Sequence, residues 1–335
     1  MIRIRDISLP PDGDMARLVQ AAARQLRISP NEIKQLDLKR RSVDARKKND
    51  VRIIYTVDVA VKGREDKILK MAHCARASLA QDPVYHVPQP RSIPAQRPVI
   101  VGFGPAGMFA ALVLSMAGLR PLVLERGQDA AARHEAVRRF WETGTLDPAS
   151  NVQFGEGGAG TFSDGKLNTG VNDPRIQWIL EQFAAAGADE SILYDAKPHI
   201  GTDALLTVVQ NLRRRILALG GEVRFSAQAT GFLREDGALS GLEVCERGET
   251  YTLPCRHAIL AIGHSARDTF ETLLQSGVPM EPKAFSMGVR IEHRQEMVNK
   301  SQYGAFADHK RLVSIKRRLS LQSAQAQTHH KESCS

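Results

Sequence analysis

The stretch PVIVGFGPAGMFAALVLSMAGLRPLVLERG, residues 98–127, has the most informative pattern in this chain. Its short apolar run, VIVG, is typical of a buried parallel strand. Gly102, Gly104 and Gly107 follow as GxGxxG, and then come an apolar helical pattern and a second strand, PLVLE. Strand, glycine turn, helix and strand stand in the order of a complete βαβ unit. The glycine pattern is therefore far more specific than it would be alone.

Each glycine of this turn has a distinct physical role. Gly102 permits the tight turn, Gly104 lets a pyrophosphate approach the backbone, and Gly107 allows the helix to pack closely on the strand. The helix N-terminus, at Pro105 and Ala106, offers unpaired N–H groups and a partial positive charge to the same pyrophosphate. These features predict a nucleotide site built on the turn.

The second strand ends on an acid, Glu125, 23 residues after Gly102. At this spacing a carboxylate can accept hydrogen bonds from the ribose of a dinucleotide. We therefore place Glu125 in the site, with Arg126 beside it. The alternative, a βαβ unit whose turn is rich in glycine for no functional reason, accounts less well for the complete pattern. We expect an α/β, Rossmann-type domain.

A second glycine-rich stretch, QFGEGGAGTFSDGKLNTG, spans residues 153–170. So many glycines add backbone freedom that folding must remove, which is unfavourable unless something requires them. Bare N–H groups can form concavities that bind phosphate or flavin ring oxygens, and hydroxyls and a lysine stand between the glycines. The alternative is an ordinary surface loop. The loop residues that we assign to the site are Gly158, Gly160, Thr161, Ser163 and Lys166.

Residues 220–268 contain three or four short strands separated by turn signals, followed by a very apolar strand, HAILAIG. We expect a β-meander that crosses the parallel sheet. Gly263 would let the backbone pass close to the ligand, and the main chain near Ala229 would meet the adenine. An NAD-binding domain usually continues directly into further βα repeats. The glycine loop and the meander therefore favour FAD over NAD.

Four segments carry a family resemblance: VGFGPAGMFAALVLSMAGLRPLVLERG, NVQFGEGGAGTFSDGKLNTG, LAIGHSARDTF and KAFSMGVRIEH. Together they resemble a bacterial family of FAD-dependent dehydrogenases, known as NAD(P)/FAD-dependent oxidoreductases, over most of residues 1–308. The resemblance implies a glutathione-reductase-like FAD fold, preceded by a small α+β domain, and a cytoplasmic location. It implies an oxidoreductase acting on an unknown small molecule, with NAD(P)H as a candidate transient electron donor. It supplies no catalytic residue.

Composition narrows the class of protein. The 335 residues suffice for about two domains, and aromatic residues, at 5%, are too sparse for a surface that stacks nucleobases. No apolar run reaches the roughly 20 residues of a membrane helix, and the first residues lack the apolar core of a secretory signal. The four cysteines lack CxxC spacing, which fits neither a zinc site nor a disulfide framework. We expect a cytoplasmic protein without a metal site or a membrane partner.

The basic charge is concentrated at the ends, since residues 1–80 hold eighteen basic and ten acidic side chains. Phosphate-neutralising charge of this kind suggests an alternative: a flavin-binding regulatory or nucleic-acid-binding protein that acts through its N-terminal domain. We do not favour it, because no aromatic residue is interleaved with these charges. The expected divisions are a small basic α+β domain (1–80), a proline-rich linker (81–98), an FAD-binding Rossmann-like domain (99–283), the start of an incomplete substrate domain (284–308) and an atypical basic, disordered tail (309–335).

The change of composition after about residue 309 suggests a truncated gene or a shifted reading frame. The tail is basic, rich in Ser and Gln, and lacks the glycine that a returning strand–helix turn needs. We therefore expect impaired activity in this form. Among possible acid–base groups, His264 is a candidate flavin-proximal residue, because it follows a strand end expected to face the cofactor. His199 is expected to be structural, and the roles of Asp164 and Lys166 stay open between proton donation and closing the loop.

Overall fold

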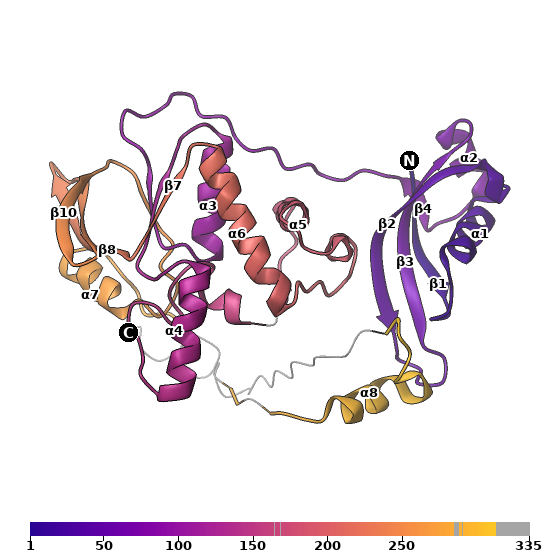
Figure 1. The fold of residues 1–335 in the computed structure, drawn as a ribbon. Coiled ribbons are helices and arrows are strands. Elements are labelled where there is room, and N and C mark those ends of the chain that lie inside the picture. Colours follow the sequence, from indigo (N-terminus) through magenta and orange to yellow (C-terminus); the bar gives the residue numbers. More distant parts are fainter. Residues whose placement is uncertain (164, 168, 285–287, 290, 313–335) are drawn as a thin grey trace, which may run out of the picture. The chain divides into compact units, whose positions relative to one another are not determined.

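The computed structural model describes residues 1–312 except 164, 168, 285–287 and 290 (Figure 1). Contacts within the chain divide it into two units. The first consists of residues 1–79 and the described residues beyond 285, and the second consists of residues 80–285. The chain is of mixed α/β structure. Among the described residues, no helix combines the length and the apolar character that crossing a membrane requires.

The N-terminal unit is a four-stranded antiparallel sheet in the order β2-β3-β1-β4, with two helices. The βαββαβ succession with this strand order is a ferredoxin-like arrangement. Alternate residues of β1 and β3 are buried with one face of α1, because strand side chains alternate between faces. The elements are β1 (Ile2–Leu9), α1 (Met15–Leu26), η1 (Pro30–Glu32), β2 (Ile33–Asp44), β3 (Arg52–Val61), α2 (Glu65–Ala72) and β4 (Ala77–Leu79).

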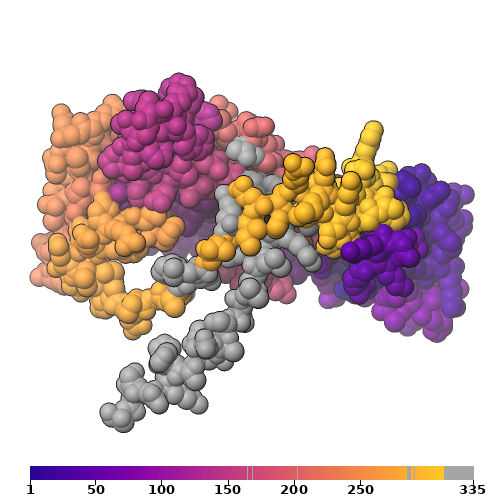
Figure 2. All heavy atoms as spheres, turned by 90° about the horizontal axis from the view of Figure 1, so that it is seen from below, coloured from indigo at the N-terminus to yellow at the C-terminus, as the bar shows by residue number. Residues whose placement is uncertain are grey.

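A segment from the other end of the chain belongs to the same unit. It contains α8 (Gln295–Tyr303) and η4 (Gly304–Phe306), and it lies against the N-terminal residues in Figure 2, yellow on indigo. Tyr303 and Leu312 share a small apolar cluster with Val51. The sequence led us to expect the start of a substrate domain over 284–308. In the structure, Tyr303 of this region, and Leu312 just beyond it, pack against Val51 of the N-terminal unit.

Polar contacts reinforce this packing. His309 Nε2 lies 2.7 Å from Asp12 Oδ1, and the Arg311 guanidinium donates to the carbonyl of Gly13. Most of the expected tail, 309–335, lies outside the described residues.

The second unit is built on four parallel strands in the order β11-β5-β6-β7. Numbered by their order along the chain, the strands lie 4-1-2-3 across the sheet, which matches the 3-2-1-4 part of the strand order of a doubly wound α/β sheet. The core strands are β5 (Val99–Val101), β6 (Leu122–Glu125), β7 (Glu222–Phe225) and β11 (Ala258–Leu260).

The two faces of this sheet carry different layers. Ile100 and Val123 face a core formed with α3 (Pro105–Met116) and α6 (Thr202–Ala218). Their neighbours in the strands face the opposite core, which is formed with an antiparallel meander. The meander consists of β8 (Ala227–Glu235), β9 (Ala238–Glu246) and β10 (Glu249–Pro254). The parallel sheet is thus the middle layer of the second unit, covered on both faces, while the ends of its strands are not covered by these two layers.

The remaining elements of the second unit are α4 (Ala130–Thr143), η2 (Gly158–Phe162), α5 (Arg175–Ala185), η3 (Glu190–Leu193) and α7 (Arg267–Gln275). Of these, α4, α5 and η2 contact α6, η3 contacts α5, and α7 contacts β8. Residues 81–98, the expected linker, contain neither helix nor strand.

Candidate functional site

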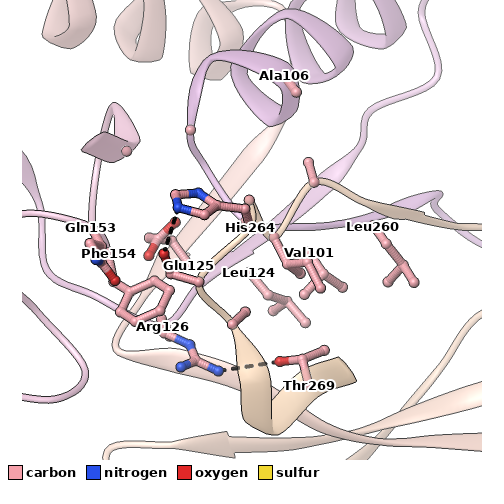
Figure 3. A pocket seen from close by; sticks show the side chains of 18 of the residues that line it. Val101, Ala106, Leu124, Glu125, Arg126, Gln153, Phe154, Leu260, His264 and Thr269 are labelled. Carbon is pink, nitrogen blue, oxygen red and sulfur yellow. Dashed lines mark hydrogen bonds between the residues drawn. The ribbon is translucent and has the colours of Figure 1, made fainter. Parts of the chain in front are cut away.

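A cavity of about 670 Å³ lies at the carboxyl ends of β5, β6 and β11. This edge of a parallel sheet is where open α/β folds bind their ligands. The walls come from the glycine turn after β5, the end of β6, the glycine-rich loop, the start of β8 and α7 (Figure 3). Its size is in the ordinary range for cofactor sites.

The three glycines of the turn meet different surroundings. Gly102 has φ +100°, and a Cβ there would lie 2.5 Å from the carbonyl oxygen of Ala261. A Cβ on Gly107 would collide with the carbonyl oxygen of Gly102. A Cβ on Gly104 would meet only the Cα of Gly158, at an ordinary 3.7 Å. The fold itself therefore requires glycine at 102 and 107 but not at 104, which faces the cavity.

The carboxylate of Glu125 is held by main-chain N–H groups. Phe103 donates to Oε2 at 2.7 Å, and Gly127 and Gly155 each donate to Oε1 at 2.9 Å. The residue is 4% exposed and lines the cavity. An ionised carboxylate has about four acceptor positions, so Oε2 keeps one for a further donor. Glu125 thus joins the glycine turn, the end of β6 and the glycine-rich loop.

Arg126 forms a second polar contact across the cavity wall. Its Nη2 lies 2.7 Å from Asp268 Oδ2. The same nitrogen lies 3.3 Å from Thr269 Oγ1 (Figure 3), and both acceptors belong to α7. Its guanidinium carbon also lies 4.6 Å from the centre of the Phe154 ring. Burial alone would raise the pKa of the Asp268 carboxyl, but hydrogen bonds from Arg126 and other donors outweigh it and lower that pKa. The ion pair therefore ties the end of β6 to α7.

Arg133 of α4 is fully buried and donates to main-chain carbonyl groups of the glycine-rich loop and of the two residues before it. Its Nε donates to Asn151 O at 2.8 Å, its Nη1 to Glu156 O at 2.6 Å and its Nη2 to Val152 O at 3.0 Å. Burial lowers the pKa of this guanidinium to about 10. The guanidinium is therefore still protonated at neutral pH and can donate all three of these hydrogen bonds.

Glu156 is also fully buried and anchors the loop to α4. Its Oε2 accepts the N–H of Ala130 at 2.8 Å. Its Oε1 lies 3.2 Å from Arg213 Nε but has no hydrogen-bond partner among the described residues. Burial raises the pKa of this carboxyl, and the Ala130 hydrogen bond and the Arg213 charge offset that effect in part.

Most residues that the sequence assigned to the site line one cavity. Those that do are Gly102, Gly104, Pro105, Ala106, Glu125, Arg126, Gly158, Gly160, Ala229 and Gly263. Residues far apart in the sequence, from the turn to the end of β11, are thereby brought together.

Gly107 and Thr161 do not line the cavity. Gly107 sits beneath the turn, where it serves close packing of α3. Thr161 is buried, and its hydroxyl donates to the carbonyl of Glu156 at 3.0 Å. We expected this hydroxyl to face a ligand, whereas the loop uses it to close its own backbone.

Ser163 and Lys166 also lie outside the cavity lining. The Ser163 hydroxyl donates to the carbonyl of Gly160 at 2.7 Å. Lys166 pairs through its backbone with His199 in an isolated antiparallel bridge, which gives His199 a structural place beside the loop. Asp164 lies outside the described residues.

Several cavity residues were missed by the sequence analysis. Gln153 and Phe154 open the glycine-rich loop, and Phe270 and Leu273 reach the cavity from α7. Phe270 and Leu273 are three residues apart on a helix that follows Gly263. This helical spacing was the signal in the sequence that could have identified them. His264 does line the cavity (Figure 3), as its position after β11 suggested. The described residues contain no group of three His, Cys, Asp or Glu side chains arranged to hold a metal ion.

Comparison with protein families gives two partial matches. Residues 1–60 match a domain of unknown function (DUF8436), and residues 284–331 match the family described as "FAD-dependent protein, C-terminal domain-like". The second match extends through most of the segment that we expected to be foreign to the family. It therefore does not support the expected break in the sequence pattern after about residue 309.

One curated relative is an uncharacterised protein of Clostridium beijerinckii, 44% identical over 325 residues. The alignment covers 96% of this chain and 60% of the relative, so the chain spans about 60% of the relative's length.

Similar solved structures include THI4 of Thermovibrio ammonificans, at 16% identity and a TM-score of 0.37, which covers 55% of this chain and 63% of that one. Another is the glycerol-3-phosphate dehydrogenase of Bacillus halodurans complexed with FAD, at 13% identity and a TM-score of 0.34, covering 52% and 36%. A geranylgeranyl bacteriochlorophyll reductase-like protein of Thermoplasma acidophilum has 17% identity and a TM-score of 0.32, covering 50% and 39%. Likeness at this level does not bear on function.

Proposed function

We propose that the second unit binds FAD noncovalently and that the protein is a cytoplasmic FAD-dependent oxidoreductase acting on a small molecule. The observation that carries the proposal is the open space at Gly104. Of the three glycines in the turn, it alone is not required by the fold, and it faces the cavity at the N-terminus of α3. A backbone without a side chain at this point suits close approach of a pyrophosphate.

The other cavity residues fit the same ligand. The remaining acceptor position on Glu125 Oε2 would take a ribose hydroxyl, and the main chain at Ala229 would meet the adenine. Gly160 and Gly263 would leave room for the ring end. The match of residues 284–331 to an FAD-dependent family supports FAD over another dinucleotide. Bound flavin would accept hydride or electrons from the substrate, and NAD(P)H is a candidate transient donor.

The test is a titration of the purified chain with FAD, followed by quenching of flavin fluorescence, with NAD as the comparison ligand. Gly104→Val should abolish FAD binding. Gly170→Val is the matched control, because a Cβ on Gly170 meets no atom within 4 Å and the residue does not line the cavity. Tight binding of NAD without binding of FAD would overturn the proposal.

The alternative function, nucleic-acid binding by the N-terminal unit, receives no support from its sheet. Domains that bind RNA on such a sheet stack bases on aromatic side chains of the central strands. The one aromatic residue of β1 and β3, Tyr55, is 8% exposed and belongs to the core with the helices. Of the basic side chains, Arg3 is paired with Asp58, and Arg46 with Asp44.

A further inference from the structure

We propose that Arg133 is a positioning residue of the cofactor site, acting through the glycine-rich loop without touching the cavity. The inference rests on the proposed function and goes beyond it. In this view Arg133 fixes the conformation of residues 151–156, and that conformation brings Gly155 to Glu125 and Gly158 to Gly104.

The first support is the unusual set of partners of this buried cation. A buried arginine commonly faces a carboxylate, because an uncompensated charge is costly. Here each of the three guanidinium nitrogens donates instead to a main-chain carbonyl, those of Asn151, Val152 and Glu156. The planar fork of donors has a fixed geometry, so three carbonyls bound to it fix the path of the segment between them.

The second support is the way the loop closes around the side chain. Gly155 has φ +116°, and a Cβ there would collide with Cδ of Arg133 at 2.4 Å. The Phe162 ring centre also lies 4.8 Å from the guanidinium carbon. The loop is therefore wrapped around Arg133, and the glycine at 155 is required by that close contact.

The third support is the connection from this segment to the cavity. The amide of Gly155 donates to Glu125 Oε1 at 2.9 Å, and the amide of Gly157 donates to the carbonyl of Phe103 at 2.9 Å. Both acceptors belong to the strand end and turn that form the cavity wall. If residues 151–156 move, these two contacts are lost, and Gly158 leaves its place over the turn.

Charge balance is consistent with a fixed cation at this position. The carboxylates of Glu125 and Glu156 both act to raise the pKa of Arg133 against the effect of burial. A lysine would keep the charge but would replace the planar fork with one compact ammonium group. Arg133→Lys therefore separates the geometric role from the charge, and Arg133→Met removes both.

The experiment compares Arg133→Lys and Arg133→Met with Arg138→Met. Arg138 is the matched control, since it lies on the same helix with a side chain that is 53% exposed and pairs with Glu135 and Glu142. Amide hydrogen exchange is measured on the FAD-free proteins at Gly155, Gly157 and Gly158, with the core strands β5 and β6 as internal reference. FAD affinity is then measured by fluorescence quenching.

We expect exchange at the loop amides to rise at least about tenfold in both Arg133 variants, because buried carbonyls lose their donors. Exchange in β5 and β6 should change much less, and FAD affinity should fall at least about tenfold. Arg138→Met should leave both measurements unchanged. If Arg133→Met does not fold, Arg133→Lys gives the answer.

Two results would overturn the inference. One is unchanged exchange at the loop amides relative to the core in Arg133→Lys. The other is a loosened loop with undiminished FAD affinity. Failure of the wild-type chain to bind FAD would overturn the proposed function, whereas the exchange measurements, made without FAD, decide separately whether Arg133 holds the loop.

Discussion

The backbone of Gly158 lies directly against that of Gly104: a Cβ on Gly158 would stand 3.0 Å from the Cα of Gly104. Gly158 itself has φ +61° and opens the short helix η2. Two glycine-rich stretches from separate parts of the sequence therefore form adjoining walls of the cavity, and neither wall contributes a side chain at the point of contact.

Gly104→Ala should separate ligand binding from folding. Gly104 has φ −72° and ψ −175°, which alanine adopts readily, and its Cβ would have ordinary contacts. We expect a change in the free energy of unfolding within about 0.5 kcal/mol but a marked loss of FAD affinity. Gly107→Ala, where the Cβ collides with the Gly102 carbonyl, should destabilise by about 1–3 kcal/mol or more. Thermal unfolding and FAD titration check both, and undiminished FAD affinity in Gly104→Ala would contradict the site.

Glu125→Ala should weaken both the fold and the site. It leaves the amides of Phe103, Gly127 and Gly155 without their acceptor. Each buried donor left unpaired costs about 1–3 kcal/mol, and loss of the ribose contact should lower FAD affinity at least several-fold. The control is Glu135→Ala, because that carboxylate is exposed on α4. Urea unfolding and fluorescence quenching measure the two effects; equal FAD affinity would mean that another residue holds the ribose.

Glu156 should give stability a characteristic pH dependence. Burial raises its pKa above the usual 4.5 in the folded protein. The folded state then binds the proton more tightly than the unfolded state, so this stabilising contribution is complete below about pH 4.5 and is lost as the pH rises through the folded pKa. Glu156→Gln should lack this component. Unfolding free energies measured from pH 4.5 upward in both proteins test it, and identical pH profiles would show that Glu156 does not contribute.

Residues 1–80 should fold without the rest of the chain, since their apolar core is formed among themselves. Limited proteolysis should cut within about 83–98, where there is no helix or strand. Because Tyr303 and Leu312 pack on Val51, the two products should then co-elute in native gel filtration. Tyr303→Ala should weaken that association. Preferential cleavage within 20–70 would show that the boundary is misplaced.

The site residues that the sequence predicted correctly as cavity-lining are those whose position follows from nearby secondary structure. The turn from Gly102 to Gly107 and the acid at Glu125 follow from the geometry of one βαβ unit, so spacing alone locates them. Gly263 lies in the cavity wall because β11 ends at the same edge of the parallel sheet as β5 and β6, and Ala229 lies there because β8 begins directly after β7.

The features that were missed are hydrogen-bond partners and contacts between distant segments, which residue spacing does not determine. The hydroxyls of Thr161 and Ser163 can serve a ligand or the loop, and the structure uses both on loop carbonyls. The packing of Tyr303 on Val51 joins distant segments and leaves no local pattern. Arg133 belongs to a buried helix face with Ala130 and Val137, but the helical spacing of these three residues does not show that the arginine holds loop carbonyls.

The wrapping of the loop around Arg133 sets the smallest piece of this protein that can be transplanted into another. A graft that stopped at Gly127, the end of the βαβ unit, would carry Glu125 without the Gly155 amide that occupies it. A graft that replaced α4 with another helix would leave three loop carbonyls without donors. Engineers who wish to transfer this glycine turn to another protein, or to recombine it among relatives, should therefore cut no earlier than Phe162 and exchange α4 and the loop as one block.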